Sequence, residues 1–377
     1  MNTSVPIKRS TVDINLPAGV LPPLSTLADL ASWNPAHFGP LVWREAFDMV
    51  LEQRSNTMFE KSDPDGYLAK ALSLLPSTSR RRFLRTPAVA TILRRDVGDQ
   101  FNGWRFAKLL LAELAATGEV AELPESVWTP RGDRFLDRSM PMYWGLPEVI
   151  LGNTGITIDE QSSFQFPDDE FGIAGTMPHA KQEREVVVFR VHSAIDALRK
   201  ACLPALEMVT TIIEVLAFRR ESVEATAFYS STFVGWPGLV RFTNAHLPDA
   251  DTAAILEALV HEAIHCILHV HEEIEGTFLR SSEAAQRTMI SPWTGAKIRL
   301  HSYIHACVVW YGIYWLWSRE WFGCGIPQRR LAMLKARAHR GFKNRPVRMG
   351  LAPFNSLVTD SIRELLQEIE DRMLSLT

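Results

Sequence analysis

Apolar residues follow a helical period in the first part of this chain and a strand period in short stretches further on. Between residues 24 and 150 they recur at helical spacing, interrupted by prolines, which predicts a series of helices. Residues 185–191 form a valine-rich run that predicts a short strand, and a long helix is expected from Ala194 to about Arg219. Two β-rich runs between Thr226 and Asn244 are separated by Gly235-Trp-Pro-Gly238, a connection typical of a hairpin.

The remainder of the chain is expected to be mostly helical. A long apolar segment follows the hairpin, and Pro248 and Asp249 supply a helix start, because proline fits the first turn and acidic residues complement the helix dipole there. Residues 272–295 predict an irregular segment, whereas residues 297–322 and Asn355–Leu376 predict helices. The last helix is amphipathic, with these apolar residues on its inner face: Leu357, Ile362, Leu365, Leu366, Ile369 and Met373.

These elements predict an α+β fold that is predominantly α-helical. The helical N-terminal region covers residues 1–150, and residues 151–377 carry the small β-sheet and the remaining helices. With 46% hydrophobic and 22% charged residues, the chain has the composition of an ordinary globular protein. Its net charge of -3 gives no reason to expect nucleic acid as a partner.

The cysteines and the apolar runs indicate in which cellular compartment the protein is expected. The four cysteines lie far apart without a Cys-x-x-Cys pair, which argues against a zinc knuckle and against a disulfide scaffold. The N-terminus lacks the apolar stretch of a secretion signal, and the aromatic run from Ile304 to Trp317 is too short to span a bilayer. We therefore expect a cytoplasmic protein that does not bind membranes.

The segment His261-Glu-Ala-Ile-His265 lies within the apolar helix and is the strongest chemical signal in the sequence. Two histidines four residues apart on a helix project from one face, about 6 Å apart along the axis, so both imidazoles can reach one divalent metal. Buried polar groups need partners, and the surrounding residues are apolar. The segment therefore predicts a metal site; the alternative is a helix whose histidines are solvated or bonded to carbonyl groups.

Two histidines do not complete a catalytic metal site, which normally takes three protein ligands and keeps other positions open. Glu283 follows His265 after seventeen intervening residues, near the spacing that some zinc peptidases use for a glutamate ligand. With Glu283 as the third ligand, Glu262 is the general base that activates a zinc-bound water. This alternative describes a zinc metallopeptidase.

Other histidines offer a different third ligand. His301 and His305 share one face of the following helix, so either could meet the first helix across a helix contact. His269 continues the face of His261, but about 12 Å along the axis separates them, too far for one ion. We expect His269 to pack or to support a ligand rather than to bind the metal.

A family resemblance is carried by four segments, which occur in this order: Trp236-Pro-Gly-Leu-Val-Arg-Phe242, Leu259-Val-His-Glu-Ala-Ile-His265, Ser291-Pro-Trp293 and Ile304-His-Ala306. From roughly residue 225 to the C-terminus, the chain resembles the HExxH-containing peptide-modification family, the 2-oxoglutarate-dependent peptide β-hydroxylases that act on ribosomal precursor peptides. The resemblance implies that His261, His265 and His305 bind the metal.

The resemblance also implies the cofactors, which are Fe(II), 2-oxoglutarate and O₂. Imidazole binds iron and zinc alike, so the ligand set by itself leaves zinc open. Where the family has an Arg-Pro pair before the third histidine, this chain reads Ala296-Lys-Ile-Arg-Leu-His301. Arg299 is then the nearest candidate to grip the distal carboxylate of 2-oxoglutarate, with Lys297 and Arg280 behind it, because a planar guanidinium binds a carboxylate at two points.

An oxygenase needs no general base, so Glu262 would there orient a ligand imidazole or a metal-bound water. The sequence predicts an Fe(II)- and 2-oxoglutarate-dependent hydroxylase of the β-carbon of a side chain in a ribosomal precursor peptide. The alternatives are the zinc metallopeptidase and a non-catalytic scaffold that binds the precursor. For residues 1–150 we expect contacts with the precursor peptide or with a second copy of the chain in a homodimer. Candidate aromatic walls of the cavity are Trp293, Tyr303, Trp310 and Tyr311.

Overall fold

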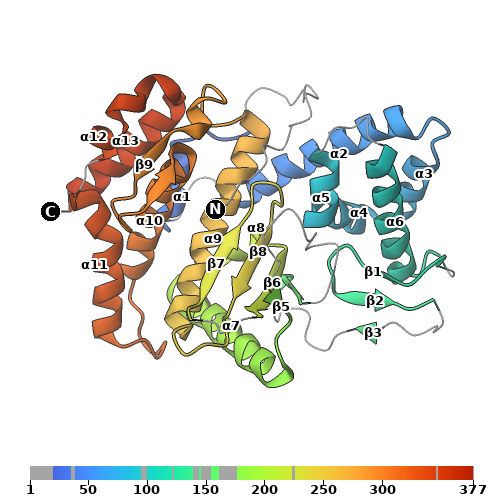
Figure 1. The fold of residues 1–377 in the computed structure, drawn as a ribbon, viewed down its shortest axis with the longest axis horizontal. Helices are drawn as coiled ribbons and strands as arrows, with labels where there is room; N and C mark the ends of the chain where they lie inside the picture. The colour runs from blue at the N-terminus through green and yellow to red at the C-terminus, as the bar shows by residue number, and fades with distance from the viewer. Residues whose placement is uncertain are drawn as a thin grey trace. The chain divides into compact units, whose positions relative to one another are not determined.

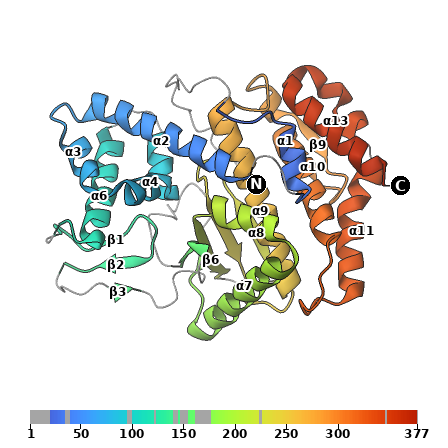
Figure 2. The ribbon, with the colours of Figure 1, turned by 180° about the vertical axis from the view of Figure 1, so that it is seen from behind.

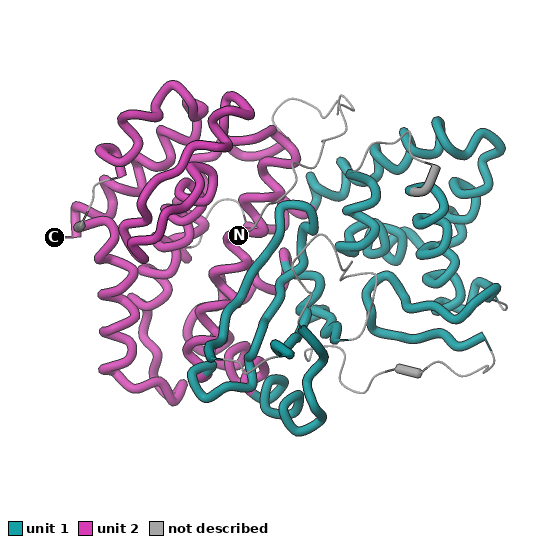
Figure 3. The backbone as a smooth tube through the Cα atoms, viewed as in Figure 1, with its two compact units in different colours: residues 1–18, 45–189, 213–250 teal, residues 19–44, 190–212, 251–377 magenta. Residues whose placement is uncertain are grey.

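The fold is predominantly helical with small sheets, as the sequence predicts (Figure 1). The computed structural model describes residues 20–34, 39–94, 100–120, 123–138, 144–145, 154–160, 176–222, 226–344 and 347–376. Two compact units divide the chain, and Figure 3 shows them in different colours. Unit 1 comprises residues 1–18, 45–189 and 213–250, and unit 2 comprises residues 19–44, 190–212 and 251–377. Both units draw on residues from either side of position 150, so the boundary expected there does not separate them.

The N-terminal helices confirm the helical period over most of residues 24–117. They are α1 (Thr26–Ala31), α2 (Leu41–Ser62), α3 (Tyr67–Leu74), α4 (Ser77–Arg85), α5 (Pro87–Arg94) and α6 (Gln100–Thr117). Within unit 1, Phe106 of α6 meets Phe59 and Phe83 edge to face, with ring centroids 5.5 and 5.4 Å apart. Such aromatic pairs stabilise the packing of the helices that carry them.

Strands follow α6, where the sequence predicted further helix. They are β1 (Val127–Trp128), β2 (Arg134–Leu136) and β3 (Trp144–Gly145), which form an antiparallel sheet in the order β1-β2-β3. Val127 and Leu136 pack on Ala112 and Ala115 of α6. Among the described residues no helix forms here, because prolines and a glycine interrupt the helical period. The two short apolar runs instead form β1 and β2, which pack against α6.

The larger sheet of unit 1 has the order β4-β6-β8-β7, with β5 paired to β6. The strands are β4 (Thr157–Asp159), β5 (Thr176–Met177), β6 (Val215–Glu221), β7 (Tyr229–Thr232) and β8 (Leu239–Thr243). β4, β6 and β8 run parallel, whereas β7 pairs antiparallel with β8. The β7–β8 pair is the hairpin predicted around Gly235-Trp-Pro-Gly238. The polar segment 151–184, which contains glycine, proline and acidic residues, predicts a long loop, and most of it lies outside the described residues.

The strand predicted at residues 185–191 is wrong, because this stretch belongs to α7 (Lys181–Ala201). Its valine run looks strand-like in isolation, but Val187, Val191 and Leu198 are all fully buried along one helical face. The helix expected from Ala194 to Arg219 is also wrong. The chain there ends α7, forms α8 (Leu203–Ile212) and then enters β6 of the sheet.

Unit 2 is built around two long helices, α9 (Thr252–Glu275) and α10 (Leu300–Trp317). Figure 2 shows both from the reverse side. Asp251 begins α9, since its side chain accepts a hydrogen bond from the Ala254 N–H at 2.7 Å, three residues later than the proline start that the sequence predicted. By length and composition α9 could cross a membrane, but 83% of its most apolar window is buried, so its place in the core accounts for that composition.

The two long helices run in opposite directions and approach closely. Glu257 of α9 bonds Trp317, whereas Glu272 near the other end of α9 bonds His301, which fixes the antiparallel direction. Gly312 permits the approach, because a Cβ added there would lie 2.5 Å from the side chain of Ile264. Trp33 also donates to the Gly312 carbonyl at 2.8 Å. The interior of unit 2 therefore holds facing side chains from α9 and α10 at short range.

The remaining elements of unit 2 correct three boundaries. β9 (Thr288–Ile290) and β10 (Lys297–Arg299) form an antiparallel pair in the segment expected to be irregular, and α10 begins only at Leu300. The final helix is α13 (Asp360–Leu374), and Leu357 precedes it in a 3-10 turn, η3 (Ala352–Leu357). The other predicted inner residues of α13 are buried. Unit 2 also contains η2 (Ala284–Gln286), α11 (Gln328–Asn344) and α12 (Val347–Leu351).

Candidate metal site

Five histidines and one glutamate meet between α9 and α10 in unit 2, and we call them the histidine cluster. Its members are His261, His265, His269 and Glu272 of α9, and His301 and His305 of α10. Spacings of four, four and three residues place the α9 members on one face of that helix, and a spacing of four does the same on α10. Helix periodicity and the antiparallel contact together gather all six side chains.

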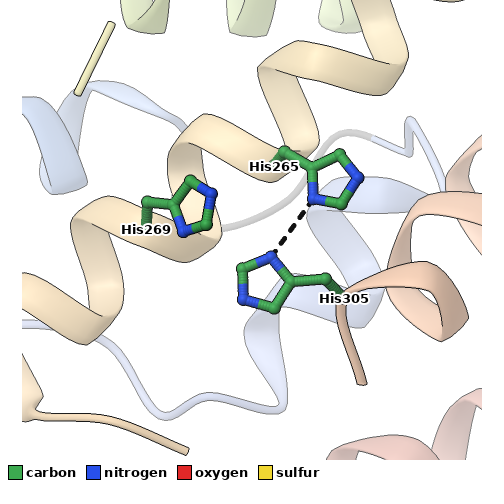
Figure 4. A group of neighbouring side chains, drawn as sticks. All are labelled: His265, His269 and His305. Atoms are coloured by element: carbon green, nitrogen blue, oxygen red, sulfur yellow. Dashed lines mark hydrogen bonds between the residues drawn. The ribbon is translucent and has the colours of Figure 1, made fainter. Parts of the chain in front are cut away.

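His265, His269 and His305 form the first group of candidate ligands, with one ligand atom of each within 4.8 Å of the others (Figure 4). The Nδ1 atoms of His265 and His305 face each other at 3.2 Å. Two nitrogens about 2.1 Å from one ion lie about 3.0 Å apart at a right angle and about 3.4 Å apart in a tetrahedron. The observed separation falls between these values, so this pair fits a shared divalent ion.

Glu272, His301 and His305 form the second group within the same distance limit. The Oε2 atom of Glu272 lies 2.8 Å from Nε2 of His301 and 3.3 Å from Nε2 of His305. The two groups share His305, which turns Nδ1 toward His265 and Nε2 toward Glu272. Glu272 is 1% exposed, so these hydrogen bonds are shielded from water.

Burial keeps three histidines of the cluster neutral, namely His261, His265 and His305. It lowers the pKa of His261 to about 4 and, with His301 nearby, that of His305 to about 3, although Glu272 acts against the shift in His305. Burial and the neighbouring imidazoles likewise hold the pKa of His265 well below its usual value. Neutral imidazoles keep a lone pair, and metal binding needs that lone pair.

His261 lies beside the first group rather than within it. Its ring centroid is 4.9 Å from that of His265, but none of its nitrogens joins either group. The centroid of its ring lies 6.1 Å from that of Trp310, in an edge-to-face arrangement. Trp310 in turn stacks on Trp293, with ring centroids 6.0 Å apart. Two of the four predicted wall residues, Trp293 and Trp310, therefore lie near the cluster, whereas Tyr303 and Tyr311 are fully buried in the core.

The two motif carboxylates of the hydrolase hypothesis do not meet the cluster as that hypothesis requires. Glu262 is buried on α9, but its carboxylate belongs to neither ligand group. Glu283 is exposed and forms an ion pair with Arg287 at 2.5 Å, one helical turn away on the surface. The structure therefore does not bring Glu283 to His265, and the third-ligand role predicted for it in a peptidase lacks support.

The basic residues predicted to hold 2-oxoglutarate lie at the start of α10 or further away. Arg299 is the residue that precedes α10, and Lys297 is exposed on β10, so both stand within four residues of His301. Arg280 instead donates to the Val358 carbonyl at 2.7 Å and to Asp360 at 2.7 Å. Its guanidinium is bound to a protein carboxylate, and of the three residues Arg299 stands nearest to His301 along the chain.

Two members of the cluster were missed or misjudged from the sequence. His269 was excluded by its distance from His261, yet it lies only one turn from His265, the residue around which the first group forms. Glu272 was assigned to an irregular segment, although α9 continues to Glu275. The signal that could have found it is its spacing of three residues after His269 and seven after His265, which keeps it on the same helical face.

No family model and no curated protein matches this chain. The chemistry of the cluster therefore rests on its own geometry. Three features of that geometry are specific: a nitrogen separation suited to one ion, a carboxylate bonded to the far nitrogen of His305, and indole rings beside His261.

Proposed function

We propose that this protein is an Fe(II)- and 2-oxoglutarate-dependent oxygenase that hydroxylates a side chain of a ribosomal precursor peptide. The observation that carries the proposal is the approach of His265 Nδ1 and His305 Nδ1 to 3.2 Å at the centre of a buried cluster. Nitrogen ligands of this kind suit iron as well as zinc, and the site offers fewer protein ligands than an octahedral ion accepts. Coordination positions on the metal therefore remain for a keto acid and for oxygen.

In this proposal His265 and His305 hold the iron, and His269 is the third protein ligand as the side chains lie. The iron, when bound, supplies the activation of oxygen that no amino-acid side chain provides. His261 is the motif histidine that competes with His269 for the third position, since its ring is the immediate neighbour of His265. Comparing the two single alanine variants decides between them, because only loss of the true ligand weakens metal binding.

The chain's own residues have three further tasks. Trp310 and Trp293 stack beside His261 and provide an apolar wall that limits the entry of water. Arg299 offers a guanidinium near the start of the helix that carries His301 and His305, suited to the distal carboxylate of 2-oxoglutarate. Glu262 is buried on α9, and its role in this proposal is to orient a ligand imidazole or a metal-bound water rather than to act as a base.

The test is anaerobic purification followed by metal analysis and by assay of succinate formation from 2-oxoglutarate. The proposal expects one iron per chain and succinate that forms only when iron, oxygen and 2-oxoglutarate are all present. Glu262→Gln should retain part of this activity. Zinc at one equivalent with scission of peptide bonds would replace the proposal by a peptidase, and the absence of a stoichiometric metal would replace it by a peptide-binding scaffold.

The cellular setting is proposed on the same footing. The described cysteines are all free, three of them buried, which accords with a reducing cytoplasm where ribosomal peptides are made. The substrate is a precursor peptide, and neither nucleic acid nor membrane is required. Residues 1–150 are proposed to contact that peptide or a second copy of the chain.

A further inference from the structure

The carboxylate of Glu272 is fixed from both ends. Its Oε1 atom accepts hydrogen bonds from the Thr277 hydroxyl at 3.1 Å and from the Phe278 backbone N–H at 3.2 Å. Its Oε2 atom faces Nε2 of His301 at 2.8 Å and Nε2 of His305 at 3.3 Å. A side chain anchored by the backbone just beyond its own helix cannot move without losing these bonds, so it presents Oε2 to the histidines in one orientation.

The contacts also fix which atoms carry protons. Oε1 of Glu272 accepts from two protein donors, and Oε2 faces one nitrogen each of His301 and His305, so donors surround this carboxylate as they surround an ionised one. An ionised carboxylate only accepts hydrogen bonds, so each imidazole nitrogen bonded to Oε2 must carry a hydrogen. For the neutral His305 ring, a hydrogen on Nε2 leaves the lone pair on Nδ1, the atom that faces His265.

We infer that Glu272 is a positioning residue, which fixes His305 in the Nε2–H tautomer and thereby aims the Nδ1 lone pair at the metal position. The inference rests on the metal site of the proposed function but not on its reaction. Carboxylates that bind the far nitrogen of a ligand histidine fix its tautomer and ring orientation and make it a better ligand. His301 shares the same oxygen and holds the carboxylate from the other side.

The tautomers change unequally when a metal binds. Without metal, the 3.2 Å contact requires His265 to donate from Nδ1 to the lone pair of His305. With metal, both Nδ1 atoms must offer lone pairs, so the hydrogen of His265 moves to its Nε2 atom while His305 keeps its tautomer. One imidazole is pre-set by Glu272, and the other adapts.

A different role for Glu272 is direct binding of a second ion together with His301 and Nε2 of His305. Two histidines and a carboxylate are a ligand set that iron accepts. The hydrogen bonds favour the positioning role, because Oε1 is already occupied by Thr277 and Phe278, and because His305 would have to lose both ring hydrogens to bind two ions. The two roles differ in the number of ions per chain.

The experiment uses the full-length protein with histidine labelled by ¹⁵N, and cobalt(II) or zinc(II) as the metal probe. Long-range ¹H–¹⁵N spectra of the wild type should show His305 as Nε2–H before and after zinc is added, and His265 changing from Nδ1–H to Nε2–H. A His305 ring that carries its hydrogen on Nδ1 in the metal-free protein would overturn the inference, whether or not any variant folds.

The matching variants are Glu272→Gln, Glu272→Asp and the control Glu273→Gln, a buried carboxylate at the next position on the same helix. We expect Glu272→Gln to bind cobalt(II) about 10- to 100-fold more weakly, because its amide can donate to Nε2 of His305 and drive the hydrogen to Nδ1. Glu272→Asp should keep the wild-type tautomer, and Glu273→Gln should keep wild-type affinity.

Two results of the titration would contradict the positioning role. Binding of two cobalt ions per wild-type chain, reduced to one by Glu272→Gln, would make Glu272 a ligand instead. Unchanged affinity in Glu272→Gln would remove it from the site altogether. Neither readout involves 2-oxoglutarate or peptide, so failure of the proposed reaction would show separately, as cobalt binding with the expected tautomers but no succinate from the iron-loaded protein.

Discussion

Two glutamates on α9, the half-buried Glu257 and the buried Glu272, have different partners. Glu257 bonds the Arg337 guanidinium and accepts a hydrogen bond from the Trp317 indole at 2.7 Å. Glu272, about four turns further along the same helix, bonds two histidines, a hydroxyl and a backbone N–H. Among the residues that the structure describes, no lysine or arginine forms an ion pair with Glu272.

The comparison separates a structural ion pair at Glu257 from a carboxylate, Glu272, that is bonded to histidines of the candidate metal site. A buried carboxylate is costly unless it is paired, and Glu257 has a permanent cation from α11. The partners of Glu272 are histidines, a hydroxyl and a backbone N–H, and a divalent ion bound by His265 and His305 would supply a positive charge through His305. Arg337 compensates the charge of Glu257, whereas the proposed function predicts that a metal compensates the charge of Glu272.

The largest effect on metal affinity is expected from a change in the histidine cluster. His265→Ala removes one of the two nitrogens that face each other, so we expect metal affinity to fall by more than about 100-fold and activity to be lost. Equilibrium dialysis with cobalt(II) measures the loss. His271→Gln is the matched control, because His271 is a buried histidine of the same helix whose Nδ1 accepts from Trp43 instead. Equal loss of metal in both variants would mean that α9 unfolds, not that a ligand is missing.

At the Glu257 end of α9, Arg337→Met should reduce the stability of the protein without changing its metal affinity. Removing one partner of a buried ion pair costs about 3–5 kcal/mol, and the partial exposure of Arg337 lowers our expectation to about 1–3 kcal/mol. Burial already raises the pKa of Glu257, so the carboxyl can take up a proton once the guanidinium is gone, which limits the cost.

Urea unfolding of the metal-free protein measures the stability of this variant, and cobalt titration measures its site. If Arg337→Met kept its stability but no longer bound metal, the roles assigned to the Glu257 and Glu272 ends of α9 would be reversed.

The buried histidine next to Glu272 predicts a pH dependence. Burial lowers the pKa of His271 to about 4, against the influence of Glu272, so the native state binds fewer protons than the unfolded state between about pH 6.5 and 4. Stability should therefore fall as the pH drops through this window, by up to about 1.4 kcal/mol per pH unit for each such histidine.

His271→Gln should reduce that slope by one proton and leave the slope above pH 7 unchanged. Unfolding of the metal-free protein at several pH values measures both slopes. Identical slopes in the variant and the wild type between pH 6 and 4.5 would mean that His271 is not held neutral.

The smallest effect is expected at the exposed carboxylate of the peptidase alternative. Glu283→Gln removes a surface ion pair with Arg287, and such pairs contribute about 0–1 kcal/mol. We expect metal affinity and succinate formation at wild-type levels and a stability change below about 0.5 kcal/mol. A loss of metal in this variant would restore Glu283 as a ligand and sharpen the case for peptidase chemistry.

The sequence predicts the parts of this fold whose signal is local. The hairpin around Gly235-Trp-Pro-Gly238, the helix α9 with its two motif histidines and the amphipathic C-terminal helix each carry a clear period or turn signal. The strand expected at residues 185–191 fails because a short apolar run does not distinguish a strand from a buried helix face. Here tertiary packing of Val187 and Val191 decides the outcome.

The candidate site was predictable to a similar extent. His265 and His305 are found from the helix spacing and the resemblance, and the structure brings them together. Glu272 was not found, because the end of α9 depends on Gly276, where the backbone turns out of the helix, and not on a change in the apolar period. The angle and depth at which α10 crosses α9 depend on Gly312, a residue with no chemical signal of its own.

The most direct test of the central claim is anomalous diffraction at the iron or cobalt edge from crystals of the metal-loaded protein. We predict one peak per chain, bonded to Nδ1 of His265 and Nδ1 of His305, with Glu272 hydrogen-bonded to Nε2 of His305 and outside the coordination sphere. A peak bonded to Glu272 and His301, or no peak between the two helices at full metal loading, would contradict the account.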